Sequence, residues 1–157
     1  ENYANSNLPQ KKIHLVILGI GEEQDKLEKK ILDLKIETKV HLLGFKENVW
    51  DYISNAKFSV LSSQYEGFPM TILESLSLGI PVISFDCESG PNEMIINNHN
   101  GILVENQNFT ELTHKMNIFV EDEILYQNCK NNSVSSVAKF QSEVVVNQWL
   151  QMLNYGN

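Results

Sequence analysis

The chain of 157 residues contains no arginine, and its twelve lysines face twenty acidic residues, which gives a net charge of −8. Proteins that bind the phosphate backbone of a nucleic acid rely on clustered lysine and arginine. A chain this acidic and without arginine is a poor candidate for such binding. We therefore expect no nucleic-acid partner.

Cysteines and long apolar runs are also scarce. Cys87 and Cys129 are the only cysteines and belong to no group with metal-ligand spacing. They predict reduced thiols of a cytoplasmic protein and no resident metal. No apolar run approaches the ~20 residues of a membrane-spanning helix. The opening ENYANSNLPQ does not have the basic and then apolar pattern of a secretory signal.

Short apolar runs alternate with helical patterns along the first two thirds of the chain. The runs are rich in Val, Ile and Leu and end at Gly, Pro or polar residues; they span 13–19, 40–44, 58–63, 81–86 and 101–104. Their near-continuous apolar character is typical of parallel strands covered on both faces. Helical spacing occupies 22–34, 48–56 and 69–78, and from about residue 108 the pattern is helical alone, ending in a helix at 141–154.

This alternation predicts an α/β fold, a Rossmann-like doubly wound parallel sheet of about five to six strands followed by C-terminal helices. The length suits a single domain over residues 1–157 with one compact core. We expect residues 1–12 to be a truncated leading segment. In the last helix, Val145, Trp149 and Met152 share one face, which predicts packing rather than a cofactor site.

The stretch EGFPMTILESLSLGIPVI, residues 66–83, follows the third strand and opens a helix. In open parallel sheets the ligand lies outside the carboxyl ends of the strands, which is where this loop falls. Gly67 allows close approach of a ligand, and Pro69 sets a helical φ in the first turn. The amides of Met70, Thr71 and Ile72 then lack intrahelical acceptors, which predicts an anion site suited to phosphate.

Two carboxylates flank this anion site. Ile72, Leu73 and Leu76 predict the buried face of the helix, and Thr71 and Glu74 share the other face. Glu74 falls roughly 7 to 8 Å along the helix axis, so Glu66 and Glu74 straddle the anion site. A carboxylate has two acceptor oxygens and matches a vicinal diol such as that of ribose.

Other interpretations of these residues remain open at this point. Glu66 has the spacing of a capping box with Ser63, although Gly67 and Pro69 interrupt such a helix. Two glutamates on a solvated face are also common in an acidic protein. A glycosidase would use two carboxylates around a glycosidic bond, but the anion site between them disfavours that hypothesis.

Several further motifs lead to weaker hypotheses. GIGEEQ at 19–24 begins like a dinucleotide fingerprint but has Gln24 in place of the third glycine. A phosphoacceptor receiver domain would need acidic residues at the ends of the first and third strands, and none is there. No histidine is placed to activate Cys87 as a nucleophile, so a small buried thiol is expected. The histidines are scattered and predict strand or surface positions rather than metal ligands; they are His14, His41, His99 and His114.

The stretch SSQYEGFPMTILESLSLGIPVISFD, followed by SGPNEMI and NNHNGILVEN, resembles the C-terminal half of retaining glycosyltransferases with the GT-B fold. The bacterial group that builds capsule, lipopolysaccharide and exopolysaccharide is the nearest in pattern. Two glutamates separated by seven residues, then a helix rich in small residues and Gly-x-Pro-Val-Ile, carry the resemblance. The resemblance extends from Ile13 to the final helix. It therefore disfavours the interpretation that Glu66 and Glu74 are two unrelated glutamates on a solvated face.

The resemblance implies roles for individual residues. Glu66, the catalytic candidate, approaches hydroxyls of the donor sugar, and Glu74 binds the ribose of a nucleoside diphosphate sugar, expected to be a UDP-sugar. Glu93 matches a partly structural acidic position. The loops that line the donor cleft follow the first three strands. Their implied donor-binding residues are Gly19, Gly21, Gly44, Phe45 and Lys46, together with Gly67, Phe68, Pro69, Met70, Thr71 and Ile72.

The resemblance also implies which parts of the family's enzymes are not found in these 157 residues. In the family, an Arg and a Lys from a preceding strand and loop neutralise the diphosphate, and a metal is usually not required. The acceptor-binding N-terminal domain would act in cis, with the last helix crossing back toward it and part of its apolar face exposed here. The 157 residues alone are therefore expected to be inactive.

The expected function is donor binding for retaining transfer to a glycan or lipid-linked acceptor in cell-surface polysaccharide synthesis. The full-length protein would be cytoplasmic or peripheral to the inner membrane. Two alternatives remain: a sugar-nucleotide epimerase of the same architecture, and a non-catalytic nucleotide-binding module.

Overall fold

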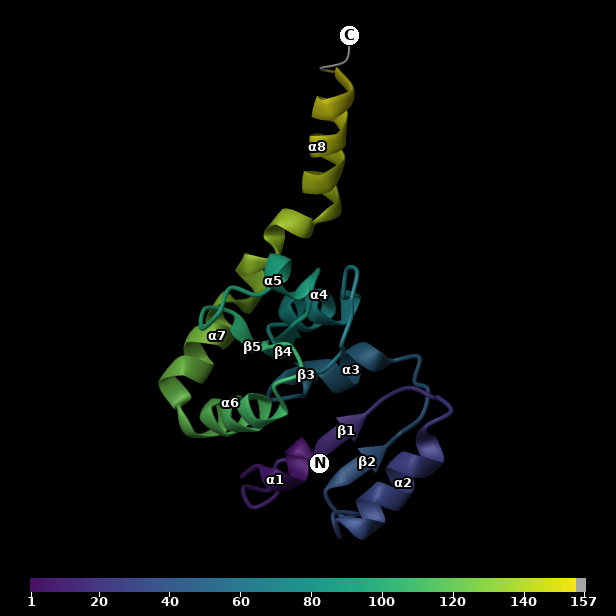
Figure 1. Ribbon diagram of the computed structural model, residues 1–157. Helices are drawn as coiled ribbons and strands as arrows, with labels where there is room; N and C mark the ends of the chain where they lie inside the picture. Colours follow the sequence, from purple (N-terminus) through teal and green to yellow (C-terminus); the bar gives the residue numbers. More distant parts are fainter. Residues whose placement is uncertain (155–157) are drawn as a thin grey trace.

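The computed structural model describes residues 1–154, which form alternating strands and helices followed by helices alone (Figure 1). The strands are β1 Leu15–Ile17, β2 Val40–Leu42, β3 Ser59–Leu61, β4 Val82–Asp86 and β5 Gly101–Glu105. The helices are α1 Asn2–Asn5, α2 Gln24–Asp33, α3 Val49–Ser54, α4 Met70–Ser77, α5 Pro91–Met94, α6 Phe109–Glu121, α7 Glu123–Ser136, the 3₁₀ helix η1 Ala138–Phe140 and α8 Ser142–Asn154. The predicted strands and helices are confirmed, within a few residues at their ends.

All strand pairs are parallel, as predicted, but they form two separate ladders. β1 pairs with β2, and β3, β4 and β5 pair in that order. In Figure 1 the strands run across the molecule in the order β5, β4, β3, β1, β2. No ladder joins β1 to β3 among residues 1–154.

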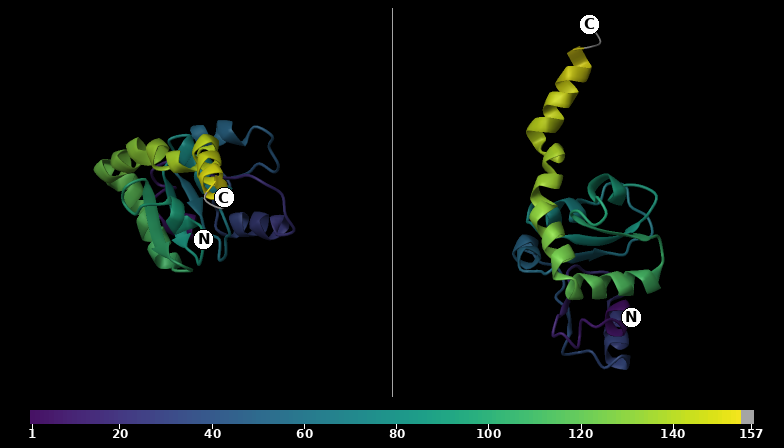
Figure 2. Two further views of the ribbon diagram at one scale, coloured as in Figure 1. Left: turned by 90° about the horizontal axis from the view of Figure 1, so that it is seen from above. Right: turned by 90° about the vertical axis from the view of Figure 1, so that its left-hand side faces the viewer.

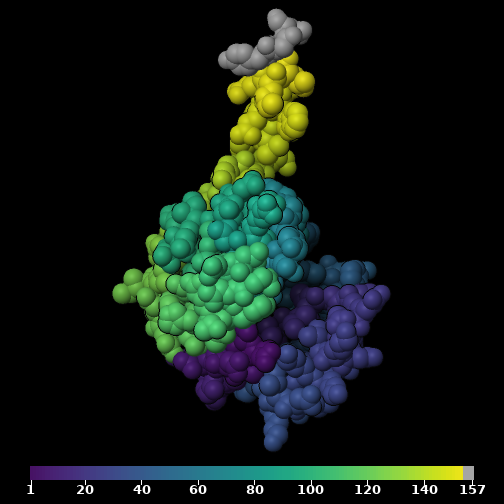
Figure 3. Space-filling model, viewed as in Figure 1, coloured from purple at the N-terminus to yellow at the C-terminus, as the bar shows by residue number. Residues whose placement is uncertain are grey.

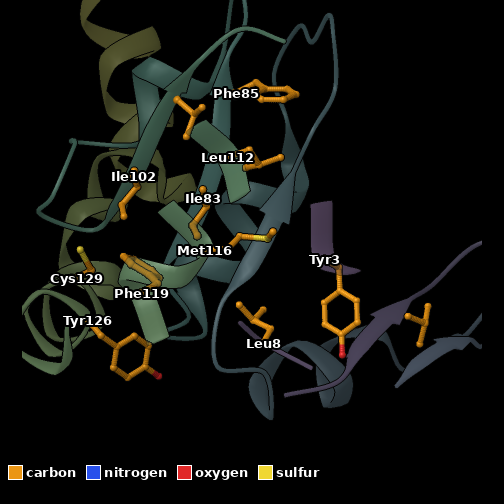
Figure 4. Close-up of a cluster of buried hydrophobic side chains, with 12 residues drawn as sticks. Tyr3, Leu8, Ile83, Phe85, Ile102, Leu112, Met116, Phe119, Tyr126 and Cys129 are labelled. Atoms are coloured by element: carbon orange, nitrogen blue, oxygen red, sulfur yellow. The ribbon is translucent and has the colours of Figure 1, made fainter. Parts of the chain in front are cut away.

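Two hydrophobic cores lie on opposite faces of the sheet. The first core contains Ile83 and Phe85 of β4 and packs them against α1 and α6 (Figure 4). The second core contains Val82 of β4 and packs it against α4 and α5. Successive side chains of a strand point to opposite faces, so this alternation along β4 puts helices on both faces. The chain is therefore doubly wound, as predicted.

The leading segment is more structured than the sequence suggested. Tyr3 in α1 and Leu8 are buried, at 6% and 4% exposed, within the first core. The Tyr3 hydroxyl donates to the carbonyl of Ile13 at 2.6 Å, just before β1. The short helix α1 was not predicted, because four residues carry too little periodicity to be recognised. Residues 1–12 thus contribute to the core.

The strands differ in how well they are covered. Four of the five residues of β4 are buried, whereas the middle residues of β1 and β3, Val16 and Val60, are 44% and 38% exposed. The prediction that all strands are covered on both faces is therefore wrong for β1 and β3.

The last helix stands apart from the rest of the molecule. α8 projects away from the body (Figures 2 and 3), and Trp149 and Met152 on it are 60% and 67% exposed. Val145 is half-buried. The predicted packing of this face is therefore wrong for Trp149 and Met152, and the expectation that part of the face lies exposed is confirmed.

Candidate functional site

Tight glycine turns end the first two strands and are bonded to each other. Gly19 and Gly44 adopt φ values of +119° and +66°, which an L side chain rarely adopts. The Gly19 amide donates to the Gly44 carbonyl at 2.8 Å. Beyond these turns, Ile20 and Phe45 are 78% and 69% exposed. The carboxyl ends of β1 and β2 are thus joined by a hydrogen bond, and the exposed Ile20 and Phe45 make this end of the sheet partly apolar.

The loop after β3 exposes a row of main-chain donors. Gly67, Phe68, Met70 and Thr71 are exposed, and their amides donate no hydrogen bond within residues 1–154. Pro69 is buried and is the N-cap of α4, one position earlier than the helical position predicted for it. Main-chain N–H groups at a helix start attract anions, because the helix dipole adds to their partial charge.

One predicted donor is not free. The Ile72 amide donates to the Pro69 carbonyl at 3.0 Å, since the first turn of α4 closes by a tighter bond than an α-helical one. Ile72 itself is fully buried in the second core. The prediction of a free amide at Ile72 is therefore wrong, and the row of free donors ends at Thr71.

Glu66 and Glu74 lie on either side of this row of donors. Glu66 is half-buried in the loop, and Glu74 is half-buried in the second turn of α4. The buried face of α4 consists of Ile72, Ser75 and Leu76, with Leu73 half-buried beside them. Ser75 joins this face because its hydroxyl donates to the Ser59 hydroxyl in β3 at 2.9 Å.

The loops after β4 and β5 hold in place the loop of residues 64–71, which carries the free amides and is called the donor loop below. The Ser89 hydroxyl donates to the Glu66 carbonyl at 2.7 Å, and the Asn106 amide donates to the Gln64 carbonyl at 3.2 Å. Gly90 adopts φ +93°, and a Cβ there would lie 2.4 Å from Pro69 Cδ. The sequence signal for this contact was Gly90-Pro91, a turn dipeptide whose three-dimensional partner cannot be read from spacing.

Other candidate residues lie at the margins of the site. Phe68 packs edge-to-face on Phe140 of η1, with 5.6 Å between ring centroids. Glu93 in α5 contributes its carbonyl, which accepts from Lys139 Nζ at 2.9 Å. Lys46 is half-buried, and no hydrogen bond among the described residues joins the 44–46 loop to the 66–71 loop. A Cβ added at Gly21 would meet nothing within 4 Å.

The remaining cysteine and histidine predictions have mixed outcomes. Cys87 is free and buried, as expected, and Cys129, expected only to be a free thiol, is buried as well. His14 and His41, predicted to be scattered, lie together, with 2.8 Å between Nδ1 and Nε2. No group of three or more metal-ligating side chains is found in the described part of the chain. No helix within residues 1–154 is long and apolar enough to span a membrane.

Residues 2–135 match the family model for glycosyl transferases group 1. The poly(ribitol-phosphate) alpha-N-acetylglucosaminyltransferase of Staphylococcus aureus is 30% identical over 139 residues, which is 88% of this chain and 28% of that protein. The lipopolysaccharide 1,6-galactosyltransferase of Salmonella typhimurium is 37% identical over 117 residues, 72% of this chain and 33% of that protein. The chain thus spans about a third or less of these relatives.

A solved structure shows the same arrangement of elements. A variant of TarM from S. aureus, in complex with Fondaparinux, alpha-GlcNAc-glycerol and UDP, matches with a TM-score of 0.88 and 27% identity. The match covers 98% of this chain and 31% of that one. From the family match and the shared architecture, this chain belongs to the glycosyl transferases group 1 family and has the fold of a GT-B glycosyltransferase domain.

Proposed function

We propose that this chain forms the donor-binding domain of a retaining glycosyltransferase that uses a nucleoside diphosphate sugar, with UDP as the nucleotide. The observation that carries the proposal is the row of free amides at Gly67, Phe68, Met70 and Thr71, flanked by Glu66 and Glu74. The diphosphate would accept from the amides, and each glutamate would accept from hydroxyls. The UDP present in the TarM complex supports this choice of nucleotide.

The chemistry would be electrostatic. As the bond to the sugar breaks, negative charge develops on the departing diphosphate, and fixed N–H groups stabilise it where it appears. Glu66 would hold the sugar hydroxyls, while Glu74 would hold the ribose. Both carboxylates lie close to the amides in the chain, so donor position would depend on the geometry of this one loop.

The full-length protein would supply the rest of the reaction. We propose an N-terminal domain in cis that binds a glycan or lipid-linked acceptor in cell-surface polysaccharide synthesis, in the cytoplasm or peripheral to the inner membrane. By the same resemblance, an Arg and a Lys from the strand and loop before this segment would neutralise the diphosphate; residues 1–157 contain no Arg. Transfer should need no metal, so EDTA should leave the rate of the full-length enzyme unchanged.

The ribose role of Glu74 is tested by titrating the full-length protein with UDP. Glu74→Gln should weaken UDP binding about tenfold to a hundredfold, since a hydrogen bond to a charged group contributes about 1.5–3 kcal/mol. Glu37→Gln is the matched control, because Glu37 is exposed and distant from the donor loop in the sequence. It should leave UDP affinity unchanged.

A second ligand, 2′-deoxy-UDP, distinguishes a hydrogen bond to the ribose from a general effect of the Glu74 charge on nucleotide affinity. 2′-Deoxy-UDP should bind the wild-type protein more weakly than UDP does, while Glu74→Ala, which keeps no side-chain acceptor, should bind the two ligands equally. An unchanged UDP affinity in Glu74→Ala, or a deoxy penalty that persists in it, would show that Glu74 does not bind the ribose. Absence of transfer from every nucleotide sugar tried would contradict the enzyme proposal.

A further inference from the structure

The free amides of the donor loop are not fixed by hydrogen bonds of their own. They lie between Gly67 and Thr71 and donate to no group within residues 1–154. Just before them, the Glu66 carbonyl accepts from the Ser89 hydroxyl at 2.7 Å. Just after them, Ile72 is fully buried in the second core. The direction in which the free amides point therefore depends on how the side chains between these two positions pack.

The Phe68 side chain packs on an element far along the chain. Phe68 lies edge-to-face on Phe140 of η1, with 5.6 Å between the ring centroids and 75° between the ring planes. Gly67 has no side chain, and the side chains of Met70 and Thr71 are exposed. Aromatic pairs in this arrangement are favourable beyond the apolar area that they bury. The contact with Phe140 therefore restricts the position of Phe68 and of the main chain that carries its amide.

Phe140 is itself held in place. It is half-buried and packs against the second core, which also contains Ile72. The Phe140 amide donates to the carbonyl of Val137 at 2.9 Å, and Val137 is buried in the same core. Lys139 Nζ donates to the Glu93 carbonyl of α5 at 2.9 Å, and in Figure 1 the chain between α7 and α8 passes beside α5. Phe140 thus offers the donor loop a fixed surface.

We propose that Phe140 is a positioning residue for the diphosphate of the nucleotide: by packing on Phe68, it holds the free amides in the arrangement that donates to the phosphates. The inference rests on the proposed function, because these amides are the groups proposed there to bind the diphosphate. Both ends of the row of amides would be attached to the second core, at Ile72 directly and at Phe68 through Phe140. A loop that populates its binding conformation only in part binds its ligand more weakly by that fraction.

Titration of the full-length protein with UDP tests the proposal. Phe140→Leu keeps an apolar side chain against the core but removes the ring, so it should weaken UDP binding about two- to tenfold, the range that an aromatic pair provides. Phe68→Leu removes the same contact at a side chain that is 45% exposed, and it keeps the amide of residue 68. It should weaken UDP binding by a similar factor. The double variant should bind UDP no more weakly than either single variant, because both changes remove one contact.

Phe58→Leu is the matched control. Phe58 is also half-buried and lies edge-to-face on Phe119, with 5.5 Å between the ring centroids and 85° between the ring planes. It precedes β3, whereas the donor loop follows β3, so the two lie at opposite ends of that strand. Phe58→Leu should keep the wild-type UDP affinity even where it lowers the free energy of unfolding as much as Phe140→Leu does. Equal losses of UDP affinity in the two variants would assign the effect to general destabilisation and overturn the proposal.

Uridine, which lacks the diphosphate, distinguishes the positioning of the amides from a change elsewhere in the site. Its affinity should be the same in the wild type, Phe140→Leu and Phe68→Leu, and equal weakening of uridine and UDP would overturn the proposal. If the wild type binds UDP and Phe140→Leu binds it equally well, the role of Phe140 is wrong while the proposed function stands. A wild-type protein that binds no UDP would contradict the proposed function and this inference with it.

Discussion

Replacing Gly90 by alanine should damage both the stability of the fold and the donor loop. The new Cβ would lie 2.4 Å from Pro69 Cδ and 2.8 Å from the Gly67 carbonyl oxygen, and φ at this position is +93°. A left-handed conformation costs an L residue roughly 1–2 kcal/mol, and overpacking adds about 1–3 kcal/mol. The expected loss in the free energy of unfolding is therefore about 2–5 kcal/mol.

Gly79→Ala provides the matched control for this substitution. Gly79 has φ +76°, but its Cβ would meet nothing closer than Val134 Cγ2 at 3.8 Å. It should therefore lose the conformational part alone, roughly 1–2 kcal/mol. The difference between the two variants in urea unfolding then measures the clash with Pro69 and Gly67.

The same pair of variants tests the link between the loop and ligand binding. In Gly90→Ala the Pro69 ring must move, and the neighbouring Phe68 and Met70 amides move with it. Losing one hydrogen bond to a phosphate would weaken UDP binding about tenfold to a hundredfold. Gly79→Ala should keep the wild-type affinity. Our reasoning would be refuted if Gly90→Ala were no less stable than Gly79→Ala and bound UDP as tightly as the wild type.

Two further predictions concern the cores. Ile72→Ala should lower the free energy of unfolding by about 2–5 kcal/mol, because Ile72 is fully buried. Met70→Ala should change it far less, because the Met70 side chain is 53% exposed. Equal losses of the two variants in urea unfolding would contradict the packing of α4. Burial raises the pKa of Cys129 from 9.0 to about 11, so the folded state keeps a proton that the unfolded state loses. The free energy of unfolding should therefore fall as pH rises from 9 toward 11, by at most about 3 kcal/mol from Cys129, and less steeply in Cys129→Ala. Tyr3 and Tyr126 add to the fall, because burial also raises their pKa values. An identical pH dependence in Cys129→Ala would exclude Cys129 as a contributor.

The strands and helices, and their parallel arrangement, could be predicted from the sequence because they depend on local patterns. Apolar runs such as 81–86 are bounded by Gly, Pro or polar residues, and α4 follows a loop with glycine and proline. Periodicity and turn residues act over a few positions, so they can be read without the fold. The same holds for Glu66, Gly67 and Glu74, whose spacing in one loop and helix fixes their order along the site.

Features that depend on contacts between distant residues were missed. The hydrogen bond from Ser89 to Glu66 and the close approach of Gly90 to Pro69 each join residues more than twenty positions apart in the chain. The pairing of His14 with His41 depends on the register of β1 with β2. Ile72 was predicted to have a free amide because spacing alone cannot distinguish a tight first turn from an α-helical one.

The sequence by itself determined the alternation of strands and helices, the position of the donor loop and the carboxylates beside it. Only the tertiary structure decided which amides are free, what holds the loop, and that β1 and β3 each have an unpaired edge. The reason is physical: a hydrogen bond or an exposed edge depends on the neighbour in space, and that neighbour can lie anywhere along the chain.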